Sequence, residues 1–253
     1  MPLQPRGIRK PIFLAAGSGG GVRCFQDLAD QFVPNQPVYG LESRNIGFPG
    51  KAFTIDAAAS QFLGAVRAVQ PVGPYLLGGY SLGGLIALEM AQMLVKIGER
   101  VGPLLLLDCY GAPEFSTALG RYRFVFEHFL GLTLTQKYRF MAERCRLLQS
   151  RVTHRLVVRP GEEAASAEAR LNEDTAAQEY VSRVQPYDGE VLLIFASQRL
   201  ATAPKHELGG WRRLLRGRLH TRTITGTHYE LLQKKNAPTA AKIISGILPN
   251  DAS

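Results

Sequence analysis

Ser81 is the residue of this chain best suited to nucleophilic chemistry. It is the centre of Gly79-Tyr80-Ser81-Leu82-Gly83, a G-x-S-x-G pentapeptide between an apolar run at 75–77 and an apolar-periodic segment at 85–97. A sharp turn from strand to helix holds such a serine in a strained backbone and lifts its hydroxyl clear of the sheet. The flanking glycines let the strand and the helix approach closely. We therefore predict a nucleophile elbow at Ser81, the alternative being a loop serine in a glycine-rich turn.

A serine nucleophile needs a base, because its hydroxyl is inert at neutral pH. His228 lies in a loop after the last predicted strand and before the last predicted helix, at the sheet edge where Ser81 is expected. We predict that His228 is this base, the alternative being a solvent-exposed loop histidine. The other histidines lie in the middle of the chain, in a polar stretch or at the start of a strand: His128, His154, His206 and His220.

A carboxylate should orient the base, and in a serine hydrolase of this kind the chain order is serine, acid, histidine. Asp108 directly follows the apolar run at 104–107, at the carboxyl end of a predicted strand. The next predicted strand continues into 196–200 with no carboxylate before Glu207. We predict Asp108 as the acid and rank Glu207 second. Asp174 and Asp188 are poorer candidates, because one lies in a predicted insertion and the other in a turn.

Two backbone N–H groups should stabilise the oxyanion of an acyl-transfer reaction. One donor is expected to be the amide of Leu82, directly after the nucleophile. The other is expected from the glycine-rich loop at 16–20, whose backbone can come close to a substrate carbonyl. A phosphate-binding loop is the alternative for these glycines, but the Walker lysine is absent and G-x-G-x-x-G is not matched in register.

Alternating strands and helices must position these residues. Apolar runs predict strands at 11–15, 38–41, 75–80, 101–107, 191–196 and 219–224, and helical spacing predicts helices at 24–32, 55–69, 83–97 and 237–247. Near-continuous apolar strands of this kind are typical of an α/β fold with a mostly parallel sheet and helices on both faces.

A long segment interrupts this alternation. No convincing strand occurs between 111 and 186, where helical patterns cover 121–130, 135–149 and 165–183. We expect one domain, 1–253, with an inserted helical lid at 112–186 over the carboxyl ends of the strands. A plain structural insertion is the alternative.

The charge of the chain limits the classes of partner. Thirty lysines and arginines against 21 acids give a net charge of +9, but they are scattered, and no nucleic-acid-binding signature is present. The densest cluster, at 212–218, is expected on the exposed side of a short helix. A basic surface can steer an acidic protein partner, or reflect composition alone.

Cysteine usage and hydropathy set further bounds. Cys24, Cys109 and Cys145 lack zinc-site or disulfide-framework spacing and are expected to be buried apolar side chains. The apolar runs are too short for a membrane span, and no signal-peptide h-region follows the basic start of the chain. We expect a cytoplasmic protein that needs no metal and no nucleic acid.

The chain resembles, over nearly its whole length, the thioesterase domains of polyketide synthetases, nonribosomal peptide synthetases and animal fatty acid synthase, in the α/β-hydrolase superfamily. The most specific match is the elbow with its surroundings, at 73–84 and 87–91. Further matches are the opening blocks at 12–14, 25–29 and 37–41, and the late blocks at 186–189 and 226–229.

The resemblance implies an α/β-hydrolase fold and a substrate. It implies an acyl, polyketide or peptidyl chain delivered as a thioester on the 4′-phosphopantetheine of an acyl or peptidyl carrier protein, with no cofactor held by the domain. Release through an acyl-Ser81 intermediate would give an acid or a macrocycle. By position relative to Phe25, Ser18 matches the family's first oxyanion amide.

The resemblance also bears on the role within the family. An acid placed like Asp108 is the arrangement of integrated, chain-releasing domains, whereas many free-standing editing (type II) thioesterases carry it after the following strand. Chain release is thus the favoured function. The alternatives are an editing thioesterase, a general carboxylesterase of the same fold, a catalytically silent carrier-docking module and, least favoured, a nucleic-acid-binding protein.

Overall fold

Strands from both halves of the chain form a single sheet. The computed structural model describes residues 1–19, 21–32, 34–42, 53–109, 164–198 and 205–249. In these residues the strand order is β1-β3-β2-β4-β5-β6-β7. β1 pairs antiparallel with β3, and all the other neighbours pair in parallel. The strands are β1 Pro2–Gln4, β2 Ile12–Ala15, β3 Val38–Leu41, β4 Leu76–Tyr80, β5 Leu104–Leu107, β6 Val191–Ala196 and β7 Leu219–Ile224.

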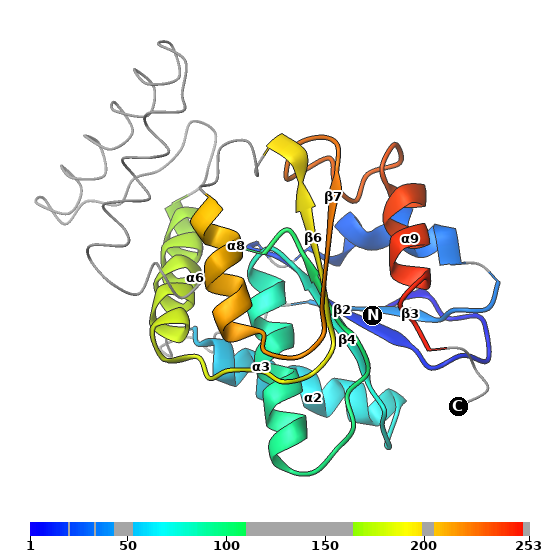
Figure 1. Cartoon of the computed structure of the whole chain (residues 1–253), viewed down its shortest axis with the longest axis horizontal. Helices are drawn as coiled ribbons and strands as arrows, with labels where there is room; N and C mark the ends of the chain where they lie inside the picture. The colour runs from blue at the N-terminus through cyan, green and yellow to red at the C-terminus, as the bar shows by residue number, and fades with distance from the viewer. Residues whose placement is uncertain (20, 33, 43–52, 110–163, 199–204, 250–253) are drawn as a thin grey trace, which may run out of the picture.

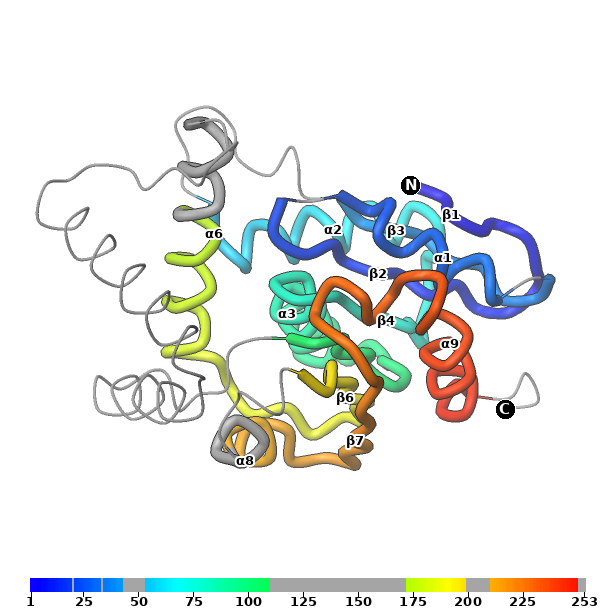
Figure 2. Tube along the Cα trace, turned by 90° about the horizontal axis from the view of Figure 1, so that it is seen from above, coloured from blue at the N-terminus to red at the C-terminus, as the bar shows by residue number. Residues whose placement is uncertain are grey.

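Helices cover both faces of the sheet (Figure 1). On one face lie α2 (Ile55–Val69), α3 (Leu82–Lys96), α6 (Ala164–Arg183) and α8 (Lys205–Leu214). On the other lie α9 (Ala237–Ser245) and a short helical stretch made of η1 (Val22–Phe25), α1 (Gln26–Ala29) and η2 (Asp30–Phe32), with α1 and α9 side by side in Figure 2.

The alternation of side chains along the strands builds two cores. In β2, Phe13 and Ala15 pack with the α2 and α3 side chains, whereas Ile12 and Leu14 pack with those of α1 and α9. All four are buried, as expected of a strand covered on both faces. This confirms the predicted α/β sheet.

Some predicted elements agree with the structure and others differ from it. The strands at 38–41, 191–196 and 219–224 and the helix at 55–69 have the predicted bounds. β1 was not predicted, since three residues are too few to show a period. The helix expected at 24–32 is instead the three short pieces η1, α1 and η2. Of the basic cluster at 212–218, only 212–214 belong to a helix, α8, which begins at Lys205.

The predicted insertion is described only at its end. α6 confirms the helix expected at 165–183, while the helices expected at 121–130 and 135–149 lie outside the described residues. α6 is anchored to α2 and α3: Tyr180 is buried in the core on that face, and Arg183 forms an ion pair with Asp56 at the start of α2. A lid over the sheet stays a prediction.

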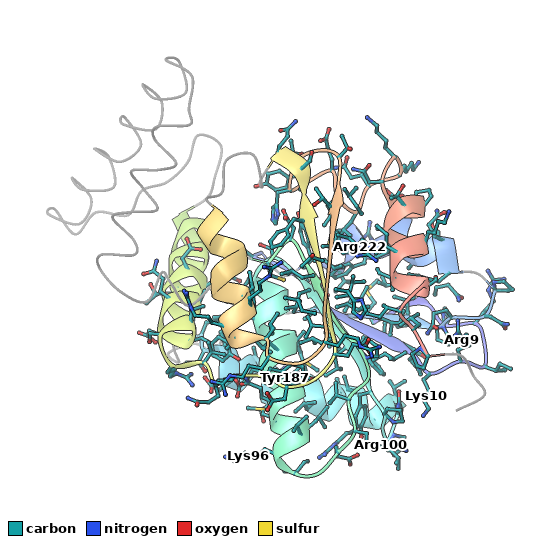
Figure 3. All side chains as sticks on the ribbon, viewed as in Figure 1. Arg9, Lys10, Lys96, Arg100, Tyr187 and Arg222 are labelled. Carbon is teal, nitrogen blue, oxygen red and sulfur yellow. The ribbon has the colours of Figure 1, made fainter. Side chains whose placement is uncertain are left out.

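The labelled basic side chains of the described residues come from several different elements (Figure 3). Arg9 and Lys10 lie near the end of α9, Lys96 is the last residue of α3, Arg100 follows that helix, and Arg222 is on β7. Among the described residues, none of the helices is long and apolar enough to span a membrane.

The cysteine prediction is only partly right. Cys109 is buried, but Cys24 is exposed, because it lies on the outer side of η1 while Val22 and Phe25 face the core. Cys145 lies outside the described residues.

Candidate active site

Ser81 occupies the turn between β4 and α3, as predicted. Its φ of 56° and ψ of −123° are unfavourable for an L-residue. The surroundings hold this conformation: the Ser81 N–H donates to the Leu107 carbonyl at 2.9 Å, and the Ser81 carbonyl accepts from Gly84 N–H at 3.1 Å. The Ser81 side chain makes no capping hydrogen bond to α3. The turn thus has the strained backbone of a nucleophile elbow.

Two glycines allow the close approach that this turn requires. A Cβ at Gly79 would overlap the carbonyl oxygen of Gly83, and a Cβ at Gly83 would overlap that of Ala15. The first overlap lies within the turn, and the second lies between the start of α3 and the end of β2. Any side chain at either position would push α3 away from the sheet.

Asp108 lies at the end of the neighbouring strand. Because Tyr80 pairs with Leu107, Ser81 and Asp108 are the residues that immediately follow paired positions of β4 and β5. Asp108 also has a positive φ, 48°, and these two are the non-glycine residues with positive φ among those described. Strain of this kind collects at functional sites, where the surrounding structure enforces it.

The Asp108 carboxyl group is fully buried and satisfied by hydrogen bonds. Oδ1 accepts from the backbone N–H of Ala196 at 2.9 Å, and Oδ2 lies 2.6 Å from Nδ1 of His228. A short contact between a carboxylate and a ring nitrogen is typical of a charge-assisted hydrogen bond. The structure therefore joins the predicted acid and the predicted base.

The loop that carries His228 is tied down on both sides. Thr227 donates to the Glu230 carboxylate through its N–H at 2.8 Å and through its hydroxyl at 3.0 Å, and the backbone bond lowers the pKa of Glu230. The amide nitrogen of buried Asn236 donates to the carbonyls of Thr225 and Glu230, both at 2.9 Å. Backbone carbonyls held this way restrict where His228 can lie.

The glycine-rich loop after β2 lies against the elbow. A Cβ at Gly17 would be 3.1 Å from the Tyr80 carbonyl oxygen and 3.2 Å from Cβ of Ser81. Leu82 is the first residue of α3, where N–H groups have no partner within the helix. The two segments predicted to supply oxyanion donors are thus next to each other and to Ser81.

The 16–19 loop also contacts α6. The Ser18 hydroxyl and the Gly19 N–H both donate to the Glu173 carboxylate, the latter at 3.2 Å. Burial raises the pKa of Glu173, and the hydrogen bonds from Ser18 and Gly19 oppose that shift.

The sequence of the chain matches one protein family over most of its length. The model of the thioesterase domain family matches residues 10–248. The chain belongs to this family.

Thioesterase-family relatives are parts of much longer proteins. The chain is 39% identical over 109 residues to malpinin synthetase of Mortierella alpina, covering 43% of this chain and 1% of that protein. It is 28% identical over 264 residues to the non-reducing polyketide synthase crz7 of Cladonia metacorallifera, covering 97% and 12%. The chain thus spans a small fraction of these relatives.

Solved thioesterase structures share the fold. A covalent complex of the NocB thioesterase domain with a fluorophosphonate nocardicin G analogue has a TM-score of 0.71 at 23% identity, covering 98% of this chain and 99% of that one. The four-domain nonribosomal peptide synthetase AB3403 has the same TM-score at 21% identity, covering 99% and 20%. The predicted α/β-hydrolase fold is confirmed.

The other histidines and acids considered for the base and the acid lie away from Ser81 or outside the residues that the structure describes. His220, in β7, forms a 2.8 Å hydrogen bond with Glu190, the residue directly before β6. Asp174 and Asp188 are exposed. His128 and His154 lie outside the described residues, as do the side chains of His206 and Glu207. In the part of this thioesterase-family chain that is described, acidic, histidine and cysteine side chains form no group that could hold a metal ion.

Three contacts at the site were not foreseen from the sequence. Tyr80 touches His228, Asn236 braces the histidine loop, and Glu173 binds the glycine-rich loop. Tyr80 could have been suspected from its place in the pentapeptide. Nothing in the sequence pattern singles out Asn236 or Glu173, because each acts on a partner chosen by the fold.

Proposed function

We propose that this chain is a serine thioesterase that releases an acyl, polyketide or peptidyl chain from a phosphopantetheinyl carrier protein through an acyl-Ser81 intermediate. Hydrolysis or macrocyclisation would complete the release. The observation that carries the proposal is the 2.6 Å Asp108–His228 hydrogen bond beside the strained Ser81 turn, in a member of the thioesterase domain family.

In the first step His228 acts as general base. A carboxylate can only accept hydrogen bonds, so Asp108 holds the proton of His228 on Nδ1 and leaves Nε2 able to take the Ser81 proton. Ser81 Oγ attacks the thioester carbonyl carbon, and the carbonyl oxygen becomes an oxyanion. The amide of Leu82 and an amide of the 16–19 loop, assigned to Ser18, stabilise it.

Collapse of the tetrahedral intermediate gives the acyl-enzyme. The carbon–sulfur bond breaks, and the pantetheine thiol leaves with the proton returned by His228. Water, or a hydroxyl or amine on the bound chain, then attacks the acyl-Ser81 ester with His228 again as base. The acyl carbon–oxygen bond breaks, and His228 returns the proton to Ser81 Oγ. Water yields an acid, whereas the internal nucleophile yields a lactone or lactam. The domain contributes Ser81, His228, Asp108 and the oxyanion amides to these steps, and the substrate is carried on the partner's phosphopantetheine.

The inserted segment belongs to the proposal as a lid. β5 ends at Leu107, and its parallel neighbour β6 begins only at Val191. The last helix of the inserted segment, α6, reaches the 16–19 loop through Glu173. We assign 112–186 to a lid that selects between water and the internal nucleophile by access to the acyl-enzyme.

Chain release is favoured over editing by the place of the acid. His228 bonds Asp108, at the end of β5, and the described residues after β6, Ser197 and Gln198, carry no carboxylate. A general carboxylesterase is the other candidate, because the same three side chains cleave oxygen esters. Substrate preference separates them: an esterase would turn over simple esters with no preference for carrier-bound thioesters.

Intact-protein mass spectrometry tests the proposal directly. Wild type and Ser81→Ala are each mixed with acyl-loaded carrier proteins and with short N-acetylcysteamine thioesters. An acyl mass on wild type alone supports Ser81 as the nucleophile, and analysis of the released product distinguishes acid from macrocycle.

Two results would overturn the proposal. Normal thioester turnover by Ser81→Ala would remove the nucleophile assignment. Cleavage of simple esters without loading from any carrier or thioester would shift the assignment to a carboxylesterase.

A further inference from the structure

Tyr80 makes two separate contacts with one residue of the candidate site. Its hydroxyl donates to the backbone carbonyl of His228 at 2.7 Å. Its ring stacks on the imidazole, with centroids 4.5 Å apart and an interplanar angle of 17°. Tyr80 is the last residue of β4 and is 8% exposed. It is therefore a buried group at the end of a sheet strand, and the His228 side chain, which comes from a loop, is placed against it.

The two contacts restrain different freedoms of His228. The hydrogen bond from the Tyr80 hydroxyl to the His228 carbonyl holds the backbone of the loop next to the end of β4. The stacked ring lies flat against the imidazole face, so the imidazole cannot turn about its Cβ–Cγ bond without colliding with Tyr80. The Nδ1 bond to Asp108 restrains the edge of the same ring. Three contacts thus hold His228: Tyr80 contacts the face of its ring and its backbone carbonyl, and Asp108 contacts the edge of its ring.

We propose that Tyr80 is a positioning residue that holds the His228 imidazole in the orientation needed to take the Ser81 proton. This inference rests on the proposed function, because it assigns His228 as the base. Tyr80 precedes Ser81 in the chain, so the backbone that presents the nucleophile also carries the group that aligns its base. The loop of the base is thus joined by a hydrogen bond and a ring contact to the residue next to the nucleophile.

A second tyrosine of the same strand region gives a matched control. Tyr75, directly before β4, is fully buried, and its hydroxyl donates to the Pro71 carbonyl at 3.0 Å. Tyr75→Phe and Tyr80→Phe each remove a buried hydroxyl bonded to a backbone carbonyl. Only in Tyr80→Phe does that carbonyl belong to His228, so a merely structural effect is common to both variants.

The experiment measures loading of Ser81 by hexanoyl-N-acetylcysteamine, followed by quenched mass spectrometry over a range of thioester concentrations. Tyr80→Phe should lower the maximal loading rate roughly two- to tenfold, the worth of one hydrogen bond. Tyr80→Leu, which removes the stack too, should lower it on the order of 100-fold. The half-saturating thioester concentration should stay unchanged, and Tyr75→Phe should load at the wild-type rate.

Two further readouts separate positioning from loss of fold. The hydrogen-bonded Nδ1 proton of His228, observed by NMR at low field, should persist in Tyr75→Phe and broaden or vanish in Tyr80→Leu. In a His228→Ala background, Tyr80→Phe should cause no further loss, because residues that act as a unit are not additive.

Specific results would overturn the inference. Wild-type loading by both Tyr80 variants would do so, as would equal losses in Tyr80→Phe and Tyr75→Phe, or a full additional loss in the His228→Ala background. Failure of wild type to load with any thioester is a different outcome, because it removes the proposed function and this inference with it.

Discussion

Asp108 and His228 are 120 residues apart in the chain and share a 2.6 Å hydrogen bond. Asp108 is fully buried, and its second oxygen is held by the N–H of Ala196. The carboxyl group therefore cannot turn away from the imidazole without losing a backbone hydrogen bond. A buried acid locked in this way is suited to fixing the tautomer of a base, which leads to the first prediction.

Asp108→Asn should reduce thioester turnover on the order of 10⁴-fold. An asparagine amide can donate to Nδ1, which moves the histidine proton to Nε2 and removes the base. Steady-state kinetics with a short thioester measure the effect, and Glu207→Gln, the second sequence candidate for the acid, serves as the control.

The Glu207→Gln control can also contradict the prediction for Asp108. A larger loss in Glu207→Gln than in Asp108→Asn would assign the acid to Glu207, despite the hydrogen bond that Asp108 makes.

Ser81→Gly should unfold at a higher temperature than Ser81→Ala. Both variants lack the hydroxyl, but only glycine adopts the positive φ of this position without strain. In other residues this backbone strain costs of the order of 1–3 kcal/mol. For a chain of this size about 1 kcal/mol corresponds to roughly 2–4 °C. Differential scanning calorimetry measures the two midpoints. Equal midpoints would show that the strain at position 81 does not exceed the roughly 0.5–1 kcal/mol that glycine costs through its flexibility in the unfolded chain.

Gly83→Ala should destabilise the fold, whereas Gly64→Ala should not. A Cβ at Gly83 would overlap the Ala15 carbonyl oxygen, and relieving such overpacking costs about 1–3 kcal/mol. Gly64, in α2, faces open space, so alanine there should add roughly 0.5–1 kcal/mol of stability. Urea unfolding of both variants compares them, and a neutral Gly83→Ala would contradict the close approach of α3 and β2.

Glu173→Gln should hold α6 more firmly at neutral pH. Burial raises the pKa of Glu173, so the folded state favours the protonated carboxyl. The stability it contributes is complete below the ordinary glutamate pKa of about 4.3. That stability is lost as pH rises through the higher folded-state value. Glutamine has no charge to bury, so its advantage should appear at pH 7 and vanish near pH 4.

Hydrogen exchange of α6 amides in wild type and Glu173→Gln, measured at both pH values, checks this prediction. Glu179→Gln, on the same helix, is the matched control. An equal gain at pH 4 and pH 7 would show that the charge of Glu173 is not responsible.

The sequence alone determined the local parts of this protein. The glycines around Ser81, with a strand before and a helix after, predicted the turn, because its strain and close packing arise within a few residues. The apolar runs predicted most strands and their parallel pairing. The order Ser81, Asp108, His228 followed from which strand ends carry suitable side chains.

Only the tertiary structure decided which distant groups meet. The contacts of Tyr80 with His228, Asn236 with the histidine loop and Glu173 with Ser18 depend on strand register and on how α6 and α9 pack. The short strand β1 is likewise defined by its pairing with β3, and residues 22–32 form three short helical pieces in place of the predicted helix. Periodicity reports which face of an element is buried, and it contains no information on the partner that buries it.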